Sequence, residues 1–228
     1  MMAKKGGTRH IKSLAAPRFF NIHSKEEMYI SRPNPGRHNY DDSVSLVVPL
    51  KQLNIVENYA DAGKIIKEGK IKINGKVIKE KKYPVGLNDI ITVNNKHYKV
   101  GVDQFNHISY NETNDNDSFI YKVVGKYKAP KGKIFIRLSD GESIDATDKA
   151  KDIYVGDSVK INSKKEIGEI FKFKEGSKCI IVHGVHAAST GKITEIKPGN
   201  MHIEKVVLIE DDKGNKFETK EKNIIVMS

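Results

Sequence analysis

The segment that most constrains the fold is Asn58–Val93, in which a helical pattern, a glycine and a tight turn follow one another. Tyr59, Ala62 and Ile66 are spaced i, i+3 and i+7, so a helix places them on one face. Apolar and basic residues then alternate, as they do in a half-buried strand. Asn74–Gly75 predicts a tight hairpin turn, because both residues tolerate a positive φ. The segment therefore predicts a helix followed by a β-hairpin.

The ends of this helix carry residues that are common at helix boundaries. Asn58 offers a side-chain oxygen to the free N–H groups of the first turn, and Gly69 favours the left-handed conformation that follows the last turn. The preceding apolar stretch, Leu46–Leu53, predicts another helix, which either begins at Pro49 or is kinked there. Two short helices and a hairpin are therefore expected in this part of the chain.

Lysines gather around the corner between the helix and the hairpin. Such a corner is a basic surface of defined shape, and it can dock on folded RNA through backbone contacts rather than by reading bases. The alternative is an ordinary solvated face that is rich in lysine. The candidate RNA-binding residues of this region are Lys51, Lys64, Lys67, Lys70, Lys72, Asn74 and Lys76.

The charge of the chain favours a polyanionic partner. Its 228 residues include 40 Lys and Arg against 29 Asp and Glu, a formal net charge of +11 at pH 7. Cys179 is the single cysteine, which excludes an internal disulfide bond and fits a reducing compartment. No apolar run is long enough to cross a membrane, and the N-terminus lacks the apolar segment of a signal peptide. We therefore expect a soluble, cytoplasmic protein.

Residues 1–40 form a basic arm in the sequence, with eight Lys and Arg against two acids, a net charge of +6. The arm is poor in apolar residues and interrupted by Gly and Pro, so it is expected to order only when it binds RNA. Phe19, Phe20 and Tyr29 can stack on bases; alternatively, two of these rings pack against the chain's own domain. The candidate RNA-binding residues of the arm are Lys4, Lys5, Arg9, His10, Lys12, Arg18, Arg32, Arg37 and His38.

The second half of the chain carries the patterns of short strands. The polar stretch Asn111–Ser118 marks an expected domain boundary. Strands are expected over Phe119–Val124, Lys133–Leu138, Ser143–Asp145 and Ser158–Ile161. The charge of this β unit is nearly balanced, so we expect it to contribute shape and spacing more than affinity.

Three further segments carry a family resemblance. They are HIKSLAAP at 10–17, SRPNPGRH at 31–38 and YPVGLNDI at 83–90. In that order they resemble the archaeal and eukaryotic "four-e" family of small-subunit ribosomal proteins, and the resemblance runs over essentially the whole chain. Within it, Asn58–Val93 resembles the RNA-binding module of two helices and a short sheet found in ribosomal proteins, pseudouridine synthases and tyrosyl-tRNA synthetases. The end at Ser228, without the long basic extension of eukaryotic relatives, favours the archaeal form.

A second resemblance lies near the C-terminus. Gly176–Ile193 is similar to the KOW motif, the core of a small barrel that contacts RNA in ribosomal and transcription-elongation proteins. Gly184 and Gly191 would let the backbone turn tightly or approach a sugar-phosphate chain closely. Together with Lys192 they are candidate RNA contacts. Ala188 stands where the family usually has a glycine.

The patterns and the resemblance together imply a multi-domain α+β chain. The expected parts are a basic rRNA-binding extension over 1–40 and a helix–hairpin (alpha-L type) RNA-binding module, with two helices and a sheet, over 41–110. A β-rich central domain over 111–172 and a KOW-type, SH3-like β-barrel over 173–228 complete the expected fold.

The sequence shows no set of residues suited to catalysis or to metal binding. His183 and His186 are three apart, with no cysteine or carboxylate nearby to complete a zinc set. Cys179 precedes an apolar strand and is expected to be buried rather than nucleophilic. Neither a GxxxxGK[ST] phosphate loop nor a G-x-S-x-G elbow occurs. We therefore expect no catalytic residue, no bound metal and no cofactor.

The resemblance implies, and the charge layout supports, a structural constituent of the small ribosomal subunit that organises its rRNA. The expected partners are small-subunit rRNA and neighbouring ribosomal proteins, with no membrane, no small-molecule substrate and no obligate homo-oligomer. Two alternatives stay open. One is a free-standing RNA chaperone or accessory RNA-binding protein, and the other is an RNA-modifying enzyme.

Overall fold

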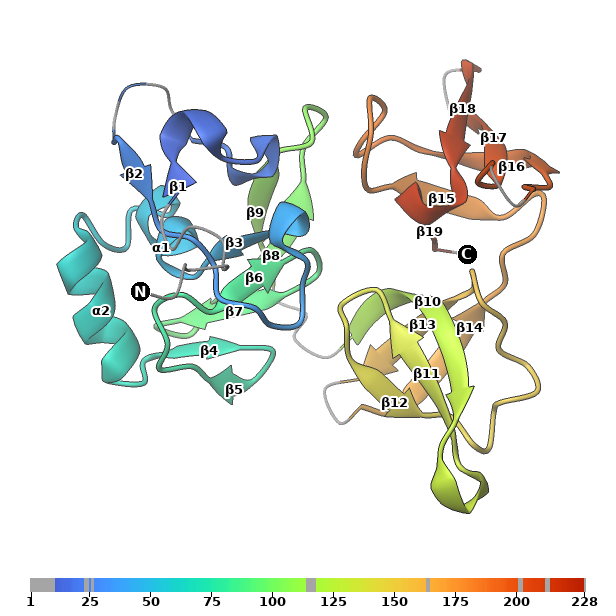
Figure 1. Ribbon diagram of the computed structural model, residues 1–228, viewed down its shortest axis with the longest axis horizontal. Helices are drawn as coiled ribbons and strands as arrows, with labels where there is room; N and C mark the ends of the chain where they lie inside the picture. Colours follow the sequence, from blue (N-terminus) through green and yellow to red (C-terminus); the bar gives the residue numbers. More distant parts are fainter. Residues whose placement is uncertain are drawn as a thin grey trace, which may run out of the picture.

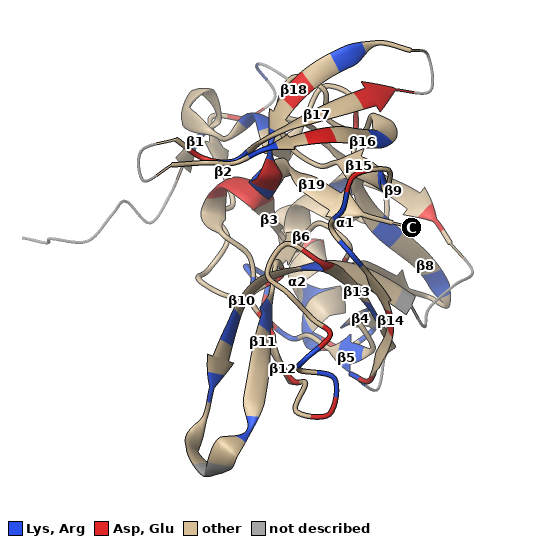
Figure 2. Ribbon diagram, turned by 90° about the vertical axis from the view of Figure 1, so that its right-hand side faces the viewer, with Lys and Arg blue, Asp and Glu red and all other residues tan. Residues whose placement is uncertain are grey.

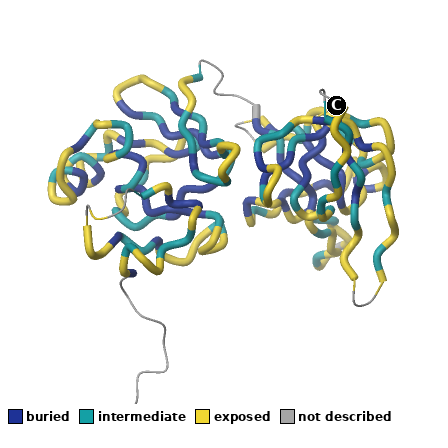
Figure 3. Tube along the Cα trace, turned by 90° about the horizontal axis from the view of Figure 1, so that it is seen from above, coloured by how far each residue is buried: buried dark blue, intermediate teal, exposed yellow. Residues whose placement is uncertain are grey.

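The computed structural model describes residues 11–22, 25, 27–113, 118–162, 165–200, 203–211 and 214–227. These residues form three units, each with an apolar core of its own. In Figure 1 the first unit lies on the left, the second at the lower right and the third at the upper right. Figure 3 shows the buried segments gathered inside the units and the exposed segments around them.

The first unit combines two short helices with small antiparallel sheets. The helices are α1 (Val47–Gln52) and α2 (Tyr59–Lys67). A five-stranded sheet runs in the order β5–β4–β7–β8–β9 and is built from β4 (Ile71–Ile73), β5 (Lys76–Val77), β7 (Ile90–Val93), β8 (Lys96–Val102) and β9 (Ile108–Glu112). Two pairs accompany it: β1 (Ile11–Lys12) with β2 (Tyr29–Ile30), and β3 (Ser43–Ser45) with β6 (Pro84–Gly86).

The second and third units are each a five-stranded antiparallel sheet. The second runs in the order β12–β11–β10–β13–β14, from β10 (Ser118–Lys128), β11 (Ile134–Leu138), β12 (Ser143–Asp145), β13 (Ser158–Asn162) and β14 (Ile167–Phe171). The third runs in the order β18–β17–β16–β15–β19, from β15 (Lys178–Ile181), β16 (Thr190–Lys197), β17 (Val206–Asp211), β18 (Lys216–Lys220) and β19 (Ile224–Val226). Short 3-10 helices lie at Ser13–Ala15, Arg18–Phe20, Tyr40–Asp42, Pro130–Gly132 and Glu221–Asn223.

The local prediction for the helix and the hairpin is largely confirmed. Gly69 follows α2 with a φ of 76°, and Asn74 and Gly75 turn the β4–β5 hairpin with φ values of 49° and 80°. α2 buries Ala62 and Ile66 in the core of the first unit. The expected cap is wrong, because the extended residue Asn58 precedes α2 without a capping hydrogen bond from its side chain.

The expected fold class is wrong. Sheet dominates the described residues, which hold only two α-helices, of six and nine residues, and the expected two-helix module is not seen. α1 stays short because the chain turns at Asn54, whose φ is 53°. In the third unit the edge strands β18 and β19 pair only with β17 and β15, so the strands described there form an open sheet and no closed barrel.

The described part of the basic arm packs onto the first unit. Phe19 and Phe20 are 3% and 0% exposed, and Ile30 of β2 joins them in the same core. The alternative interpretation, that two rings pack against the chain's own domain, is therefore what the structure shows. Tyr29 remains 49% exposed. Phe19, Phe20 and Ile30 thus find apolar partners within the protein, whereas Leu14 and Met28 of the arm are 98% and 70% exposed.

Polar and apolar contacts join the three units. The Asn88 side chain of the first unit donates to the Ile120 carbonyl of the second at 2.8 Å. The Ser158 hydroxyl of the second unit accepts from the Val226 amide of the third at 3.0 Å. Ile90, from β7, is buried in the core of the second unit. The expected domain boundaries at residues 40, 110 and 172 stay predictions.

Candidate nucleic-acid interface

Exposed lysines surround the point where α2 passes into the β4–β5 hairpin. Ile71 and Ile73 of β4 are buried, and the alternation of the strand therefore turns Lys72 away from the core. Gly69 ends α2 within a few residues of this strand, which brings the lysines of the helix next to those of the hairpin. We call this surface the basic corner; it consists of Lys64, Lys67, Lys70, Lys72 and Lys76.

Two lysines of the basic corner have acidic neighbours on the surface. Lys64 Nζ lies 3.0 Å from Asp61 Oδ1, and Lys70 Nζ lies 2.7 Å from Glu68 Oε2. All four side chains are at least 48% exposed. Ion pairs this exposed contribute about 1 kcal/mol or less, so a phosphate can replace the carboxylate at little cost. The corner therefore keeps its cations available to a polyanion.

Asn74, which the sequence groups with these lysines, has a side chain that serves the fold. Its Nδ2 donates to Asp89 Oδ1 at 2.7 Å, and its Oδ1 accepts from the Ile90 amide at 2.8 Å. Both ends of the amide are thus engaged inside the first unit. Asn74 ties the β4–β5 turn to the start of β7.

Asp89 is a buried carboxylate at the centre of the first unit, only 1% exposed. Besides Asn74 it accepts from the Gly86 amide at 3.0 Å, and its Oδ2 lies 2.9 Å from His38 Nε2. Burial raises the pKa of Asp89, but His38 and Arg37 together with these hydrogen bonds outweigh it, so the net pKa is below its ordinary value. His38 of the arm therefore faces an acid of the protein itself.

Arg37 is likewise directed inward, although the sequence places it in the basic arm. Its Nη2 donates to Asp140 Oδ2, and its Nε lies 3.7 Å from Glu142 Oε1. Its side chain is 19% exposed and that of Asp140 is 2% exposed. Burial by itself lowers the pKa of Arg37, but the nearby carboxylates of Asp89 and Asp140 together outweigh this effect. The net pKa is therefore above its ordinary value, and the guanidinium stays charged. Arg37 thus links the arm to the second unit.

The other cations of the arm lie in different surroundings. Lys12 and Arg18 are exposed, and the guanidinium of Arg32 lies over the Tyr40 ring at 5.1 Å from its centroid. Lys51 of α1 pairs with Glu27 of the arm at 2.6 Å. The candidates Lys4, Lys5, Arg9 and His10 lie outside the described residues.

The candidates of the third unit are split between its surface and its core. Gly184 is exposed with a φ of 105°, as a tight turn requires, and Lys192 is exposed on β16. Gly191 is buried, and a Cβ there would lie 2.6 Å from the Glu210 carbonyl oxygen, so this glycine permits β16 and β17 to approach. Ala188 adopts a φ of 61°, the left-handed conformation that a glycine adopts more easily.

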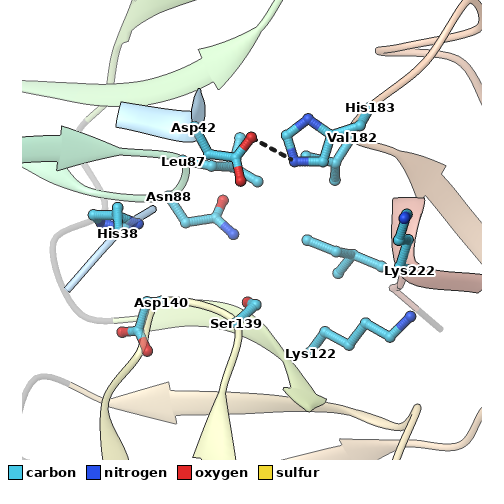
Figure 4. Close-up of a pocket in the computed structure, with 11 residues that line it drawn as sticks. His38, Asp42, Leu87, Asn88, Lys122, Ser139, Asp140, Val182, His183 and Lys222 are labelled. Atoms are coloured by element: carbon cyan, nitrogen blue, oxygen red, sulfur yellow. Dashed lines mark ion pairs between the residues drawn. The ribbon is translucent and has the colours of Figure 1, made fainter. Parts of the chain in front are cut away.

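A small cavity of about 70 Å³ lies where the three units meet, and Figure 4 shows the side chains around it. Asp42 of the first unit lies 3.6 Å from His183 of the third unit across its upper side. Lys122 donates to the Glu221 carbonyl of the third unit, and burial lowers the pKa of this lysine to about 8. The charged side chains that line the cavity are thus bound to other groups of the protein. The cavity is therefore a junction between the units.

A larger groove of about 930 Å³ lies between the arm, α1 and β9. Its lining mixes apolar side chains such as Ile30 and Val48 with polar ones. Gln52 accepts a hydrogen bond from the Tyr110 hydroxyl at 2.8 Å, and burial raises the pKa of Tyr110. These groups satisfy one another and present no pair of a nucleophile and a base.

The described histidines and the cysteine lie in surroundings that suit neither a metal site nor a reactive thiol. Among the described residues no group of three or more His, Cys, Asp and Glu side chains could hold a metal ion. His186 stacks on Phe217 at a ring distance of 4.2 Å. Cys179 is 1% exposed, as expected, and burial raises the pKa of its thiol to about 11. In the described parts of the chain no helix is long and apolar enough to span a membrane.

One basic element escaped the sequence analysis, which treated the second unit as nearly neutral. Residues 124–138, in β10, β11 and the turn between them, hold five Lys and Arg and no Asp or Glu. Figure 2 shows this hairpin projecting from the body of the molecule with Lys and Arg on both strands. A charge count over a window of this length, rather than over a whole domain, is the signal that finds it.

Comparisons with known proteins identify two domain families in the chain. The RS4NT domain family matches residues 5–41, and the S4 domain family matches residues 46–91. The first match covers residues 5–40 of the arm, and the second covers both helices, strands β4 to β6 and the first two residues of β7. The basic corner therefore lies within the S4 domain.

Whole-chain relatives extend these matches. The chain is 34% identical to small ribosomal subunit protein eS4 of Methanococcus maripaludis (strain C6), covering 96% of this chain and 93% of the relative. It is also 34% identical to the protein of the same name from Methanocaldococcus jannaschii, covering 99% and 96%. The structure matches the crystal structure of the 30S ribosomal protein S4e from Thermoplasma acidophilum with a TM-score of 0.69 and 27% identity, covering 82% of this chain and 96% of that one. This chain therefore belongs to the eS4 family of small ribosomal subunit proteins.

Proposed function

We propose that this chain is a structural constituent of the small ribosomal subunit and that it binds rRNA through the basic corner. The observation that carries the proposal is the convergence of five exposed lysines on one rigid helix–hairpin corner inside the S4 domain. Membership of the eS4 family supports the ribosomal role. The net charge of +11 supports an RNA partner.

The corner binds by neutralising phosphates and by fitting the shape of folded RNA. Lysine ammonium groups act as point charges on phosphate oxygens, and they do not read base sequence. The hydrogen bonds of the Asn74 side chain with Asp89 and Ile90 hold the hairpin turn in place. The lysines therefore meet the RNA in a fixed arrangement, which limits the RNA shapes that fit.

The remaining candidates extend this surface. We assign RNA contacts to Lys12 and Arg18, which are exposed on the arm, and to Lys192, which is exposed on β16. Lys4, Lys5, Arg9 and His10 belong to the same proposal on the basis of charge alone. Arg37 and His38 instead orient the arm, because both already face acids of the protein.

The cellular setting follows from the ribosomal role. We propose that the protein works in the cytoplasm as part of the ribosome, next to other ribosomal proteins, and that it acts by binding rather than by catalysis. The buried Cys179 thiol, with its raised pKa, is consistent with this, because a thiol of that kind is a poor nucleophile at neutral pH.

Co-sedimentation with small subunits in high salt tests the proposal. We expect the full chain to remain with purified small subunits, since several contacts must break together before it dissociates. Release into the soluble fraction, with the free protein still able to anneal RNA strands, would indicate an RNA chaperone instead. A modified nucleoside, formed when the purified protein is incubated with rRNA, would indicate an enzyme.

A further inference from the structure

One face of the β10–β11 hairpin presents an aromatic ring pair to solvent. Tyr127 lies opposite Phe135 in the register of the two strands, and their rings stack at 5.8 Å with planes 16° apart. Tyr127 is 47% exposed, although the neighbouring residue Ile136 is fully buried on the other face. The ring pair therefore stands on the solvent side of the sheet, in a hairpin that projects from the molecule (Figures 1 and 2).

Cations flank this ring pair on both sides along β11. Phe135 and Arg137 share one face of β11, Lys133 stands just before the strand, and Asp145 of β12 lies opposite Phe135 in the register. The guanidinium of Arg137 lies over Gly125, with Nε and Nη2 3.7 Å from where a Cβ would be. Lys133 Nζ is 3.6 Å from Asp145 Oδ2 in an exposed pair that phosphate can replace.

The hairpin is anchored to the body at its base. Lys126 Nζ donates to the Ala150 carbonyl and lies 3.3 Å from the Ile153 carbonyl oxygen. Lys126 thus serves the fold, while Lys133 and Arg137 face solvent beside the rings. This division leaves a rigid platform of two aromatic rings between two cations.

We propose that this platform binds an unpaired base of RNA, with the rings stacking on the base and Arg137 and Lys133 holding the adjoining phosphates. The inference rests on the proposed function, because it adds a second contact to the same RNA. Unpaired bases stack on exposed aromatic and guanidinium planes, and this combination recurs in single-strand binding. The absence of any acidic residue from 124 to 138 in the sequence favours a polyanion over a basic protein partner.

Fluorescence gives a direct test, because the chain has no tryptophan. The Tyr127→Trp variant introduces a single indole into the platform, and Tyr154→Trp introduces one at a 65% exposed site in the same unit. The probe is small-subunit rRNA transcribed in vitro, added to the full chain. We expect strong quenching of the Tyr127→Trp indole, as a base stacks on it, and little change for Tyr154→Trp.

Affinity measurements separate stacking from charge. The double variant Tyr127→Leu, Phe135→Leu keeps an apolar cross-strand pair but removes the rings, and we expect on the order of 10- to 100-fold weaker binding with the salt dependence unchanged. Arg137→Gln should instead make the dependence of log affinity on log salt shallower by about 0.7. Circular dichroism verifies the fold of each variant, and the Tyr127→Trp titration decides the matter if the Leu variant does not fold.

The outcomes distinguish the inference from the proposed function. Normal rRNA affinity without quenching, and with the Leu variant within about twofold of the parent chain, would overturn the platform and leave rRNA binding by the basic corner intact. Quenching by ribosomal proteins of the small subunit but not by rRNA would also overturn it, since the occupant would then be a protein. Failure of the parent chain to bind rRNA at all would overturn the proposed function and the inference together.

Discussion

Arg37 of the arm and Lys64 of the basic corner look alike in the sequence, yet the structure gives them opposite surroundings. Arg37 is 19% exposed and faces Asp140, which is 2% exposed, whereas Lys64 is 74% exposed beside an acid that is itself 48% exposed. The first pair is part of the protein interior. The second is a surface contact that a phosphate can displace.

The difference teaches that the partner of a cation decides its role. A buried charge is costly unless an opposite charge and hydrogen bonds compensate it, so an inward cation is fixed to its acid. An exposed lysine has no such constraint, and it can exchange a carboxylate for a phosphate. Arg37 thus links the arm to the second unit and His38 ties it to Asp89 of the first unit, while the exposed lysines of the corner can meet RNA.

The largest effect expected from this comparison is on stability. Arg37→Met should lower the free energy of unfolding by about 3 kcal/mol, because Asp140 would remain buried without its partner. Denaturant unfolding of the full chain measures the change. Lys72→Met, at an exposed position, is the matched control and should stay within about 0.5 kcal/mol of the parent. Equal losses of unfolding free energy in the two variants would contradict the difference between the inward Arg37 and the exposed corner lysines.

A second effect depends on pH. The pKa of Asp89 is below its ordinary value of 3.8, so its charged form stabilises the fold above that pH, and this contribution is lost as the pH falls below 3.8. Asp89→Asn should cost about 2 kcal/mol at pH 7, because the charged partner of His38 is removed. The difference from the parent chain should shrink as the pH falls below about 4. Unfolding curves between pH 3 and 7 test this, and a constant difference would argue against a charged Asp89.

The third effect concerns RNA rather than stability. Replacing Lys67, Lys72 and Lys76 together by Gln should weaken rRNA binding on the order of tenfold and reduce the slope of log affinity against log salt by about 2. Filter binding across a series of salt concentrations provides both numbers. The matched control replaces three exposed lysines outside the corner, Lys151, Lys172 and Lys174, by Gln. If both triple variants bind alike, the affinity comes from overall charge and not from the corner.

The smallest effect is expected within the corner itself. Asp61→Asn removes the acid 3.0 Å from Lys64, and we expect unfolding free energy to change by less than about 0.5 kcal/mol. The rRNA affinity should rise slightly, because the lysine loses a competitor for phosphate. Calorimetric titration with rRNA measures this, and a drop in affinity would show that the acid positions the lysine.

Local features of the fold were readable from the sequence because they depend on neighbouring residues. The turn at Asn74 and Gly75 and the helix end at Gly69 follow from which residues tolerate a positive φ. The role of Arg37 could not be predicted in this way, since its partner Asp140 lies 103 residues further along the chain. Nothing in the sequence near Arg37 distinguishes it from an arginine that meets phosphate.

Predictions of larger-scale features were wrong because these features also depend on residues that are far apart in the sequence. Whether β18 pairs with β19 depends on the curvature of the whole third sheet, so an alternating pattern predicts strands but not a closed barrel. The burial of Phe19 and Phe20 depends on the apolar core of the first unit, whose residues come from distant parts of the sequence. The aromatic platform of β10 and β11 was missed because the charge was averaged over the whole unit, although the five cations of residues 124–138 were visible in the sequence.

Site-directed crosslinking in the assembled small subunit tests the central claim most directly. Cys179 is buried with a raised pKa, so a thiol introduced at the surface can be labelled selectively with a photoreactive group. Lys72→Cys places the group in the basic corner, and Asn39→Cys places it on the arm beside His38. We predict crosslinks to rRNA from position 72 and none from position 39. Crosslinks to rRNA from position 39 without any from position 72 would contradict the account.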